Sequence, residues 1–126
     1  MITLDHIGPP ARDNQDAAGH LAHILGAGYH GPDRHFAPVH VNPQLTLDFY
    51  TVERVEPLHL AFRADDDAFD AIVRRVHALA IPYGNDPNDP ANGRLDHPLA
   101  PRGLYFRTPD GHLIEVMTLP AEGRPL

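Results

Sequence analysis

The sequence places one histidine and one acidic residue at equivalent points of its two halves. His6 and Asp48 belong to the first half, and His59 and Glu115 belong to the second. Imidazole nitrogens and carboxylate oxygens are common protein ligands of divalent transition metals. Two copies of one structural unit, related by a pseudo-twofold axis, would bring these four side chains together. The repeat therefore predicts a metal site.

The segments around these residues match as well. An aspartate that can begin a helix follows each histidine by seven residues, at Asp13 and at Asp66. Each acid lies in a strand-like heptapeptide that ends in threonine, LTLDFYT (45–51) or HLIEVMT (112–118). We therefore expect a single domain over residues 1–126, with module one at about 1–55 and module two at about 56–120.

Composition excludes several classes of function. A chain of 126 residues has the length of one domain, and its net charge of −7 with 10 basic residues provides no surface for a phosphate backbone. No apolar segment approaches the roughly 20 residues that cross a membrane, and the N-terminus does not resemble a signal peptide, so we expect a cytoplasmic protein. Because the chain has no cysteine, nitrogen and oxygen must hold any metal.

Hydrophobic periodicity and turn residues predict the elements of module one. Alternation predicts a strand over 1–7 that ends at Gly8-Pro9-Pro10. A helix of about 12 residues is expected to begin at Asp13 or Asn14 and to end at Gly26, a residue suited to a left-handed C-cap. Further strands are expected over 35–42 and 45–52, with a turn at Asn42-Pro43 and space for another strand near 28–31.

Module two repeats this order. We expect a strand over 58–63, then a helix whose N-terminus is stabilised by Asp65, Asp66 and Asp67. A proline-rich stretch to about Arg102 lacks periodicity and is a candidate lid. A hairpin over 103–107 and 112–118 turns at Thr108-Pro109-Asp110-Gly111, and the whole pattern predicts an α+β fold.

The alternation also predicts which side chains face a cavity. Asp48 and His59 lie opposite the large apolar residues of their strands, so each strand can pack one face on a helix and present the other. Glu115 differs, because Leu113 and Met117 share its face. Ionising a buried carboxylate among apolar neighbours costs several kcal/mol unless a partner compensates the charge. A divalent cation would do so.

Three segments together resemble the vicinal oxygen chelate superfamily. They are LDHIG (4–8), HLAF (59–62) and GLYFRTPDGHLIEVMT (103–118), of which the last is the most specific. This superfamily includes glyoxalase I, extradiol dioxygenases, fosfomycin-resistance transferases and bleomycin-resistance proteins. The resemblance implies two βαβββ modules that form a curled mixed sheet around a metal site.

The resemblance also implies a ligand set. His6, His59 and Glu115 match the metal ligands of the superfamily's enzymes, and Asp48 matches a further carboxylate of glyoxalase-like members. Asp48 is one methylene shorter than glutamate, so it either binds the metal or falls short of it and serves as a base or as a partner to bound water. Glu115 can likewise leave the metal to move a proton. The set suits Fe, Mn, Zn or Ni.

Other side chains are candidates for the substrate site. His40 precedes the Asp48 strand and either faces the same cavity or is a half-exposed strand residue. His97 and Arg102 belong to the long loop and either contact substrate or solvate the loop. Tyr105 and His97 are possible counterparts of a histidine and a tyrosine near the metal in extradiol dioxygenases.

Two functions from different classes follow. The first is a metal-dependent enzyme that chelates a small oxygen-rich substrate through two oxygens, as a glyoxalase-like lyase or isomerase, a dioxygenase or a thiol transferase. The second is a metal-free protein that binds a small molecule or antibiotic. Filled ligand positions and few aromatics, nine Phe plus Tyr and no Trp, favour the enzyme.

Departures from the family limit the assignment, and assembly follows from it. The segment GHLAHILG (19–26) lacks the aromatic residues usual in glyoxalase-like and transferase members, and no glutathione site can be mapped. Short members of the superfamily commonly dimerise, so we expect a symmetric homodimer. In several members each site takes ligands from both chains; in that case His6 and Asp48 would come from one chain and His59 and Glu115 from the other.

Overall fold

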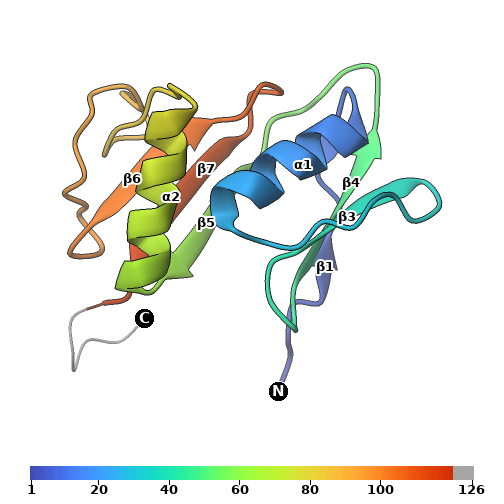
Figure 1. Ribbon diagram of the computed structural model, residues 1–126, viewed down its shortest axis with the longest axis horizontal. Helices are drawn as coiled ribbons and strands as arrows, with labels where there is room; N and C mark the ends of the chain where they lie inside the picture. The colour runs from blue at the N-terminus through green and yellow to red at the C-terminus, as the bar shows by residue number, and fades with distance from the viewer. Residues whose placement is uncertain (121–126) are drawn as a thin grey trace. The chain divides into compact units, whose positions relative to one another are not determined.

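A computed structural model describes residues 1–120 of the chain. The chain divides into two compact units, unit 1 (Met1–Leu58) and unit 2 (His59–Leu126). Each unit contains one helix and one mixed sheet (Figure 1). The predicted α+β class is confirmed. The longest helix has 13 residues, and no helix in the described part of the chain is long and apolar enough to span a membrane.

The sheet of unit 1 is built around its last strand. In chain order the elements are β1 (His6–Ile7), β2 (Pro10–Ala11), α1 (Asn14–Leu25), β3 (Phe36–His40) and β4 (Thr46–Thr51). Strands β1 and β2 both pair in parallel with β4, and β3 pairs with it in an antiparallel direction. Its core includes Val39, Leu47 and Phe49, which are almost fully buried.

The predicted first strand requires correction at both ends. Residues 1–5 are not in a strand, and the pairing resumes at Pro10 after an interruption at Gly8-Pro9. Proline lacks an N–H donor but keeps its carbonyl acceptor. The Tyr50 N–H donates to the carbonyl oxygen of Pro9 at 3.1 Å, so β1 and β2 form one interrupted strand along β4.

The caps of α1 follow the sequence signals. The Asp13 carboxylate accepts a hydrogen bond from the Asp16 N–H at 3.0 Å, as an N-cap residue does. Gly26 ends the helix with φ of 70°, a left-handed conformation that glycine adopts without a steric penalty. The prediction of a helix of about 12 residues ending at Gly26 is confirmed.

Unit 2 has the same order of elements. They are β5 (His59–Ala64), α2 (Asp66–Ala78), β6 (Gly103–Arg107) and β7 (Leu113–Thr118), with β7 in the middle of the sheet. Asp65, rather than the matched Asp66, is the N-cap of α2. The apolar stripe of α2 contains the buried residues Phe69, Ile72 and Val76. On β7, the face opposite to that of Glu115 contains the buried residues Ile114 and Val116.

The hairpin and the long loop complete unit 2. The hairpin turn is closed by Thr108 and His112, and Gly111 has a φ of 90°. Residues 79–102 contain no helix or strand, but Gly84 forms an isolated bridge with Tyr105. Side-chain hydrogen bonds among Asn85, Asn92 and Asp96 hold this loop together.

The strand register reproduces the sequence repeat. His6 pairs with Thr46, two residues before Asp48, and His59 pairs with Leu113, two residues before Glu115. On the other side of each middle strand, Pro38 pairs with Asp48 and Tyr105 pairs with Glu115. Because alternate residues of a strand share a face, each histidine lies on the same sheet face as its unit's acid.

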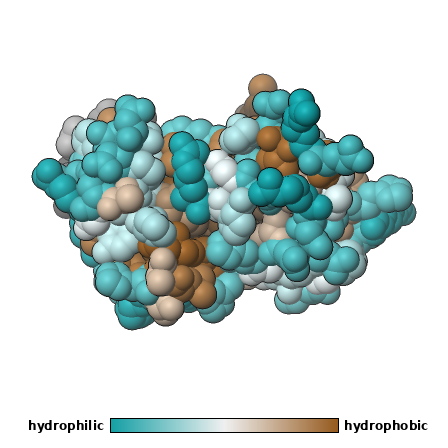
Figure 2. Space-filling model, turned by 90° about the horizontal axis from the view of Figure 1, so that it is seen from above, coloured by the Kyte–Doolittle hydropathy of each residue, from teal (hydrophilic) through white to brown (hydrophobic). Residues whose placement is uncertain are grey.

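Large apolar side chains also occur at the surface. Figure 2 shows one face of the molecule, where hydrophobic residues gather in patches among predominantly hydrophilic ones. In the described residues beyond the N-terminal segment, the exposed large apolar side chains are Phe36, Tyr50, Leu79, Leu99 and Leu119.

Candidate functional site

Glu115 is the most deeply buried carboxylate among the candidate residues. It lies on β7, the middle strand of unit 2, and only 6% of its side chain is exposed. Leu113 and Met117 share its face and are themselves buried. The neighbouring strands place Ala61 and Tyr105 beside it. This burial is consistent with the sequence prediction for Glu115. The acid lies among apolar neighbours and needs a partner that compensates its charge.

Two imidazoles contact the carboxylate, one at each oxygen. His59 Nε2 lies 2.8 Å from Oε1 of Glu115, and His97 Nε2 lies 2.7 Å from Oε2. His59 belongs to β5 and half of its side chain is exposed, whereas the His97 side chain is fully buried. Hydrogen bonds to a buried carboxylate favour its charged form. The imidazoles therefore provide the compensation that Glu115 requires.

Tyr105 completes this cluster. Its ring stacks on His97, with ring centroids 5.6 Å apart, and is tilted against His59 at 6.1 Å. Burial, followed by the hydrogen bond to Glu115 and the negative charge of that residue, raises the pKa of Tyr105 to about 12. The phenol therefore stays protonated near neutral pH and can donate to the carboxylate. We call His59, His97, Tyr105 and Glu115 the Glu115 cluster.

Unit 1 presents its candidates on one face of its sheet. The register puts His6, His40, Thr46 and Asp48 on the same side of their strands. The Nδ1 atom of His40 lies 3.5 Å from Oγ1 of Thr46, and its ring stacks on His30 with centroids 6.2 Å apart. His40 therefore shares a sheet face with Asp48, and it is exposed at the end of β3.

His6 has a local acidic partner. Its Nδ1 atom lies 2.8 Å from a carboxylate oxygen of Asp5, and 61% of its side chain is exposed. The hydrogen bond to Asp5 raises the pKa of His6 above the ordinary value, and the charges of Asp5 and Asp48 add to this effect. The adjacent Asp5-His6 pair was present in the sequence, but its role was not recognised there.

Arg102 makes a different set of contacts. Its guanidinium donates to Asp70 at 2.7 Å and to Asp66 at 3.1 Å, both on α2, and lies over the Phe69 ring at 4.8 Å from the centroid. These contacts tie the end of the long loop to α2. Arg102 is one of the four residues predicted to contact substrate, and its charge is paired with carboxylates of α2.

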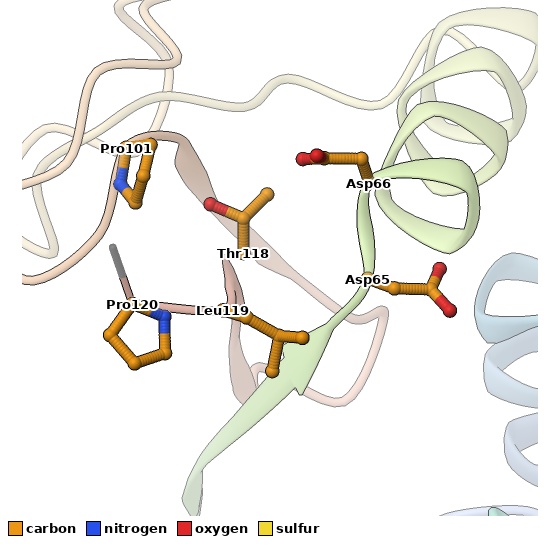
Figure 3. Close-up of a pocket in the computed structure, with 6 residues that line it drawn as sticks. All are labelled: Asp65, Asp66, Pro101, Thr118, Leu119 and Pro120. Atoms are coloured by element: carbon orange, nitrogen blue, oxygen red, sulfur yellow. The ribbon is translucent and has the colours of Figure 1, made fainter. Parts of the chain in front are cut away.

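A pocket at the N-terminal end of α2 is separate from the Glu115 cluster. It is lined by Asp65, Asp66, Pro101, Thr118, Leu119 and Pro120 (Figure 3). The Asp66 carboxylate points toward Thr118, whereas that of Asp65 points away from it. Thr118 follows Glu115 by three residues on β7, so the two side chains belong to opposite faces of the strand.

The Glu115 cluster supplies some of the donor atoms that a divalent metal requires. In the described chain, no group of three or more histidine, aspartate and glutamate side chains is arranged to hold an ion. His59 and Glu115 nevertheless bring an imidazole nitrogen and a carboxylate oxygen within 2.8 Å. These are suitable donors for the metals predicted from the sequence, and metal binding would release the proton that they share.

Comparisons with known proteins identify related structures. No family model matches the sequence, and no curated protein matches it. Oxidase ChaP-H1 is 33% identical, with 98% of this chain and 100% of that chain covered and a TM-score of 0.89. Oxidase ChaP-H2 is 32% identical, with 96% of each chain covered and a TM-score of 0.88.

A more distant match has the same fold. The fosfomycin resistance protein FosX from Listeria monocytogenes is 21% identical, with 99% of this chain and 100% of that chain covered and a TM-score of 0.70. At this level of identity the likeness concerns the fold alone. Together the matches extend over nearly the full length of the chain.

Proposed function

This chain belongs to the vicinal oxygen chelate superfamily, and we propose that it is a divalent-metal-dependent oxidase of a small, oxygen-rich organic molecule. Two proteins named as oxidases are 32% and 33% identical to it over almost the whole chain. This similarity favours oxidation, with dioxygen as the oxidant, over the lyase and isomerase reactions that the sequence left open.

The observation that carries the proposal is the contact between His59 and Glu115. An exposed imidazole and a buried carboxylate meet at 2.8 Å, at the positions that the repeat predicted. We propose these two residues as metal ligands. His6 of unit 1 is proposed as a further ligand, because it has the same strand register as His59.

The proposed chemistry divides between the metal and the protein. A bound divalent metal would act as a Lewis acid toward two neighbouring oxygens of the substrate. Tyr105 would keep its proton and hold the Glu115 carboxylate through a hydrogen bond. Asp48 is only half-buried, so its carboxylate is proposed either as a further ligand or as the base that removes a proton from a substrate hydroxyl.

The alternative function is metal-free binding of a small molecule or an antibiotic. The likeness to a fosfomycin resistance protein is limited to the fold at 21% identity. The pairing of His59 with a buried acid is more readily explained by metal binding than by an apolar binding cavity, which would be lined mainly by hydrophobic and aromatic side chains.

The decisive experiment measures metal content and oxygen uptake on protein purified without chelators. We expect a stoichiometric divalent metal, and oxygen consumption with one or more members of a panel of catechols and α-hydroxyketones. His59→Ala should lose both, whereas His77→Ala, which alters an exposed histidine on α2 paired with Tyr83, should keep them. Absence of metal from the wild-type protein would contradict the proposal.

The same preparation tests the proposed homodimer. Light scattering after size-exclusion chromatography should give twice the 13.9 kDa mass of the chain. A monomer that binds metal would contradict ligand sharing between chains, while leaving the proposed oxidase activity intact.

A further inference from the structure

The long loop of unit 2 delivers a buried histidine to the proposed ligand Glu115. His97 lies in the irregular segment 79–102, yet its side chain is fully buried and its Nε2 atom is 2.7 Å from Oε2 of Glu115. The other oxygen of the carboxylate faces His59. The proposed ligand set does not account for a second imidazole at this position.

The hydrogen bonds of His97 determine which ring nitrogen carries the proton. The backbone N–H of Leu99 donates to Nδ1 of His97 at 3.0 Å. A backbone N–H can only donate, so Nδ1 must accept and the single proton of the neutral ring lies on Nε2. The Nε2–H group therefore donates to Oε2 of Glu115, and neither nitrogen has a free lone pair for a metal.

The backbone leaves space for this ring at Gly103. A Cβ atom at Gly103 would lie 2.5 Å from Cδ2 and 2.8 Å from Cγ of His97, closer than real contacts allow. The Gly103 N–H also donates to the Leu95 carbonyl at 2.8 Å, which holds the loop against the start of β6. Tyr105, two residues after Gly103, stacks on the His97 ring. The position of His97 is thus determined on several sides.

We propose that His97 is a positioning residue that occupies Oε2 of Glu115 and leaves Oε1 as the carboxylate oxygen available to a metal. Through His97, the fold of loop 79–102 would set the orientation of that ligand. The full burial of the His97 side chain argues against direct contact with substrate. This inference rests on the proposed function, because it concerns the same metal ligand.

Metal affinity of two substitutions at His97 provides the first test. Glutamine carries an amide nitrogen the same number of bonds from Cα as Nε2 and can donate to Glu115, whereas the amide of asparagine is too short. Loss of a hydrogen bond to a metal ligand typically lowers affinity by about 10–100-fold. We expect that loss for Zn²⁺ and Mn²⁺ in His97→Asn and an affinity close to wild type in His97→Gln, measured by calorimetry.

A third substitution displaces the His97 ring but keeps the histidine. Gly103→Ala should displace His97 and reduce metal affinity in the same direction as His97→Asn. Arg94→Ala is the matched control, because it removes an exposed ion pair with Asp96 in the same loop. Thermal denaturation of each metal-free variant establishes that the protein is folded before its affinity is compared.

A measurement on the metal-free protein tests the hydrogen bond itself. Nitrogen-15 NMR of labelled histidine should show His97 protonated on Nε2 and unprotonated on Nδ1, with the pattern lost in Gly103→Ala. Equal metal affinity in wild type, His97→Asn and Gly103→Ala would overturn the positioning role and leave the proposed function standing. Wild-type protein that binds neither Zn²⁺ nor Mn²⁺ would overturn both.

Discussion

The two units have the same strand register but surround their acids differently. In unit 1, Asp48 is half-buried and pairs across the sheet with Pro38, and His6 contacts the neighbouring Asp5. In unit 2, Glu115 is buried, pairs with Tyr105 and contacts two imidazoles. A repeated backbone therefore places equivalent side chains without making their chemistry equivalent.

The difference arises largely from the segment between helix and hairpin. In unit 1, residues 26–35 connect α1 to β3, whereas the longer segment 79–102 connects α2 to β6. This extra length brings His97 to the acid of unit 2. Comparison of the units thus separates the contribution of the repeat from that of the loop.

The largest expected effect comes from neutralising each acid in turn. Glu115→Gln should lower divalent-metal affinity by more than ~100-fold, a loss beyond that usual for a residue that only orients a ligand. Asp48→Asn should cause a smaller loss, because the shorter acid is either an additional ligand or a base. Calorimetric titration with Zn²⁺ compares the two variants. Equal losses would show that the two acids are equivalent despite their different surroundings.

An intermediate effect is expected on the ionisation of Tyr105. Burial is the largest cause of its raised pKa, followed by the hydrogen bond to Glu115 and the charges of Glu115 and Asp86, so Glu115→Gln should lower this pKa from about 12 without restoring 10.0. The raised value also means that Tyr105 favours folding below pH 10, and that this contribution is lost as pH rises from 10 to about 12. Phenolate absorbance, measured as a difference from Tyr105→Phe, follows the change. An unchanged pKa would exclude Glu115 as a cause.

The smallest effect is expected at His6. Asp5→Asn should lower the pKa of His6 toward the ordinary histidine value of 6.5, because the hydrogen bond to Asp5 is the largest cause of the raised pKa. Asp48→Asn should lower it less, since Asp48 acts only through its charge. The stabilisation from a raised histidine pKa is present below pH 6.5 and is lost as pH rises through the folded-state value. Proton NMR titration measures both variants, and a larger effect of Asp48→Asn would reverse the assigned order.

Several features of the fold could be predicted because local chemistry specifies them. The Asp13 cap, the Gly26 terminus and the Thr108–Gly111 turn each depend on residues close together in the sequence. The first strand was predicted incorrectly over residues 1–5, because alternation alone does not guarantee a pairing partner. Its continuation at Pro10 was also missed, because a proline carbonyl can still pair where its nitrogen cannot.

The sequence predicted more of the candidate site in unit 2 than in unit 1. The repeat singled out His59 and Glu115, which the structure brings into contact. His6, Asp48 and their part in a metal site stay predictions, as do substrate roles for His40, Arg102 and Tyr105. His97 was only one candidate in a loop without periodicity, and no pattern in that loop specified its contact with Glu115.

The sequence by itself determined the superfamily, the α+β order of elements and the doubled histidine and acid, because periodicity, caps and motifs act over short distances. Only the tertiary structure decided that His97 reaches Glu115 and that Arg102 instead pairs with α2. Both contacts depend on how an irregular loop returns to a sheet and a helix distant in sequence, which local propensities do not specify.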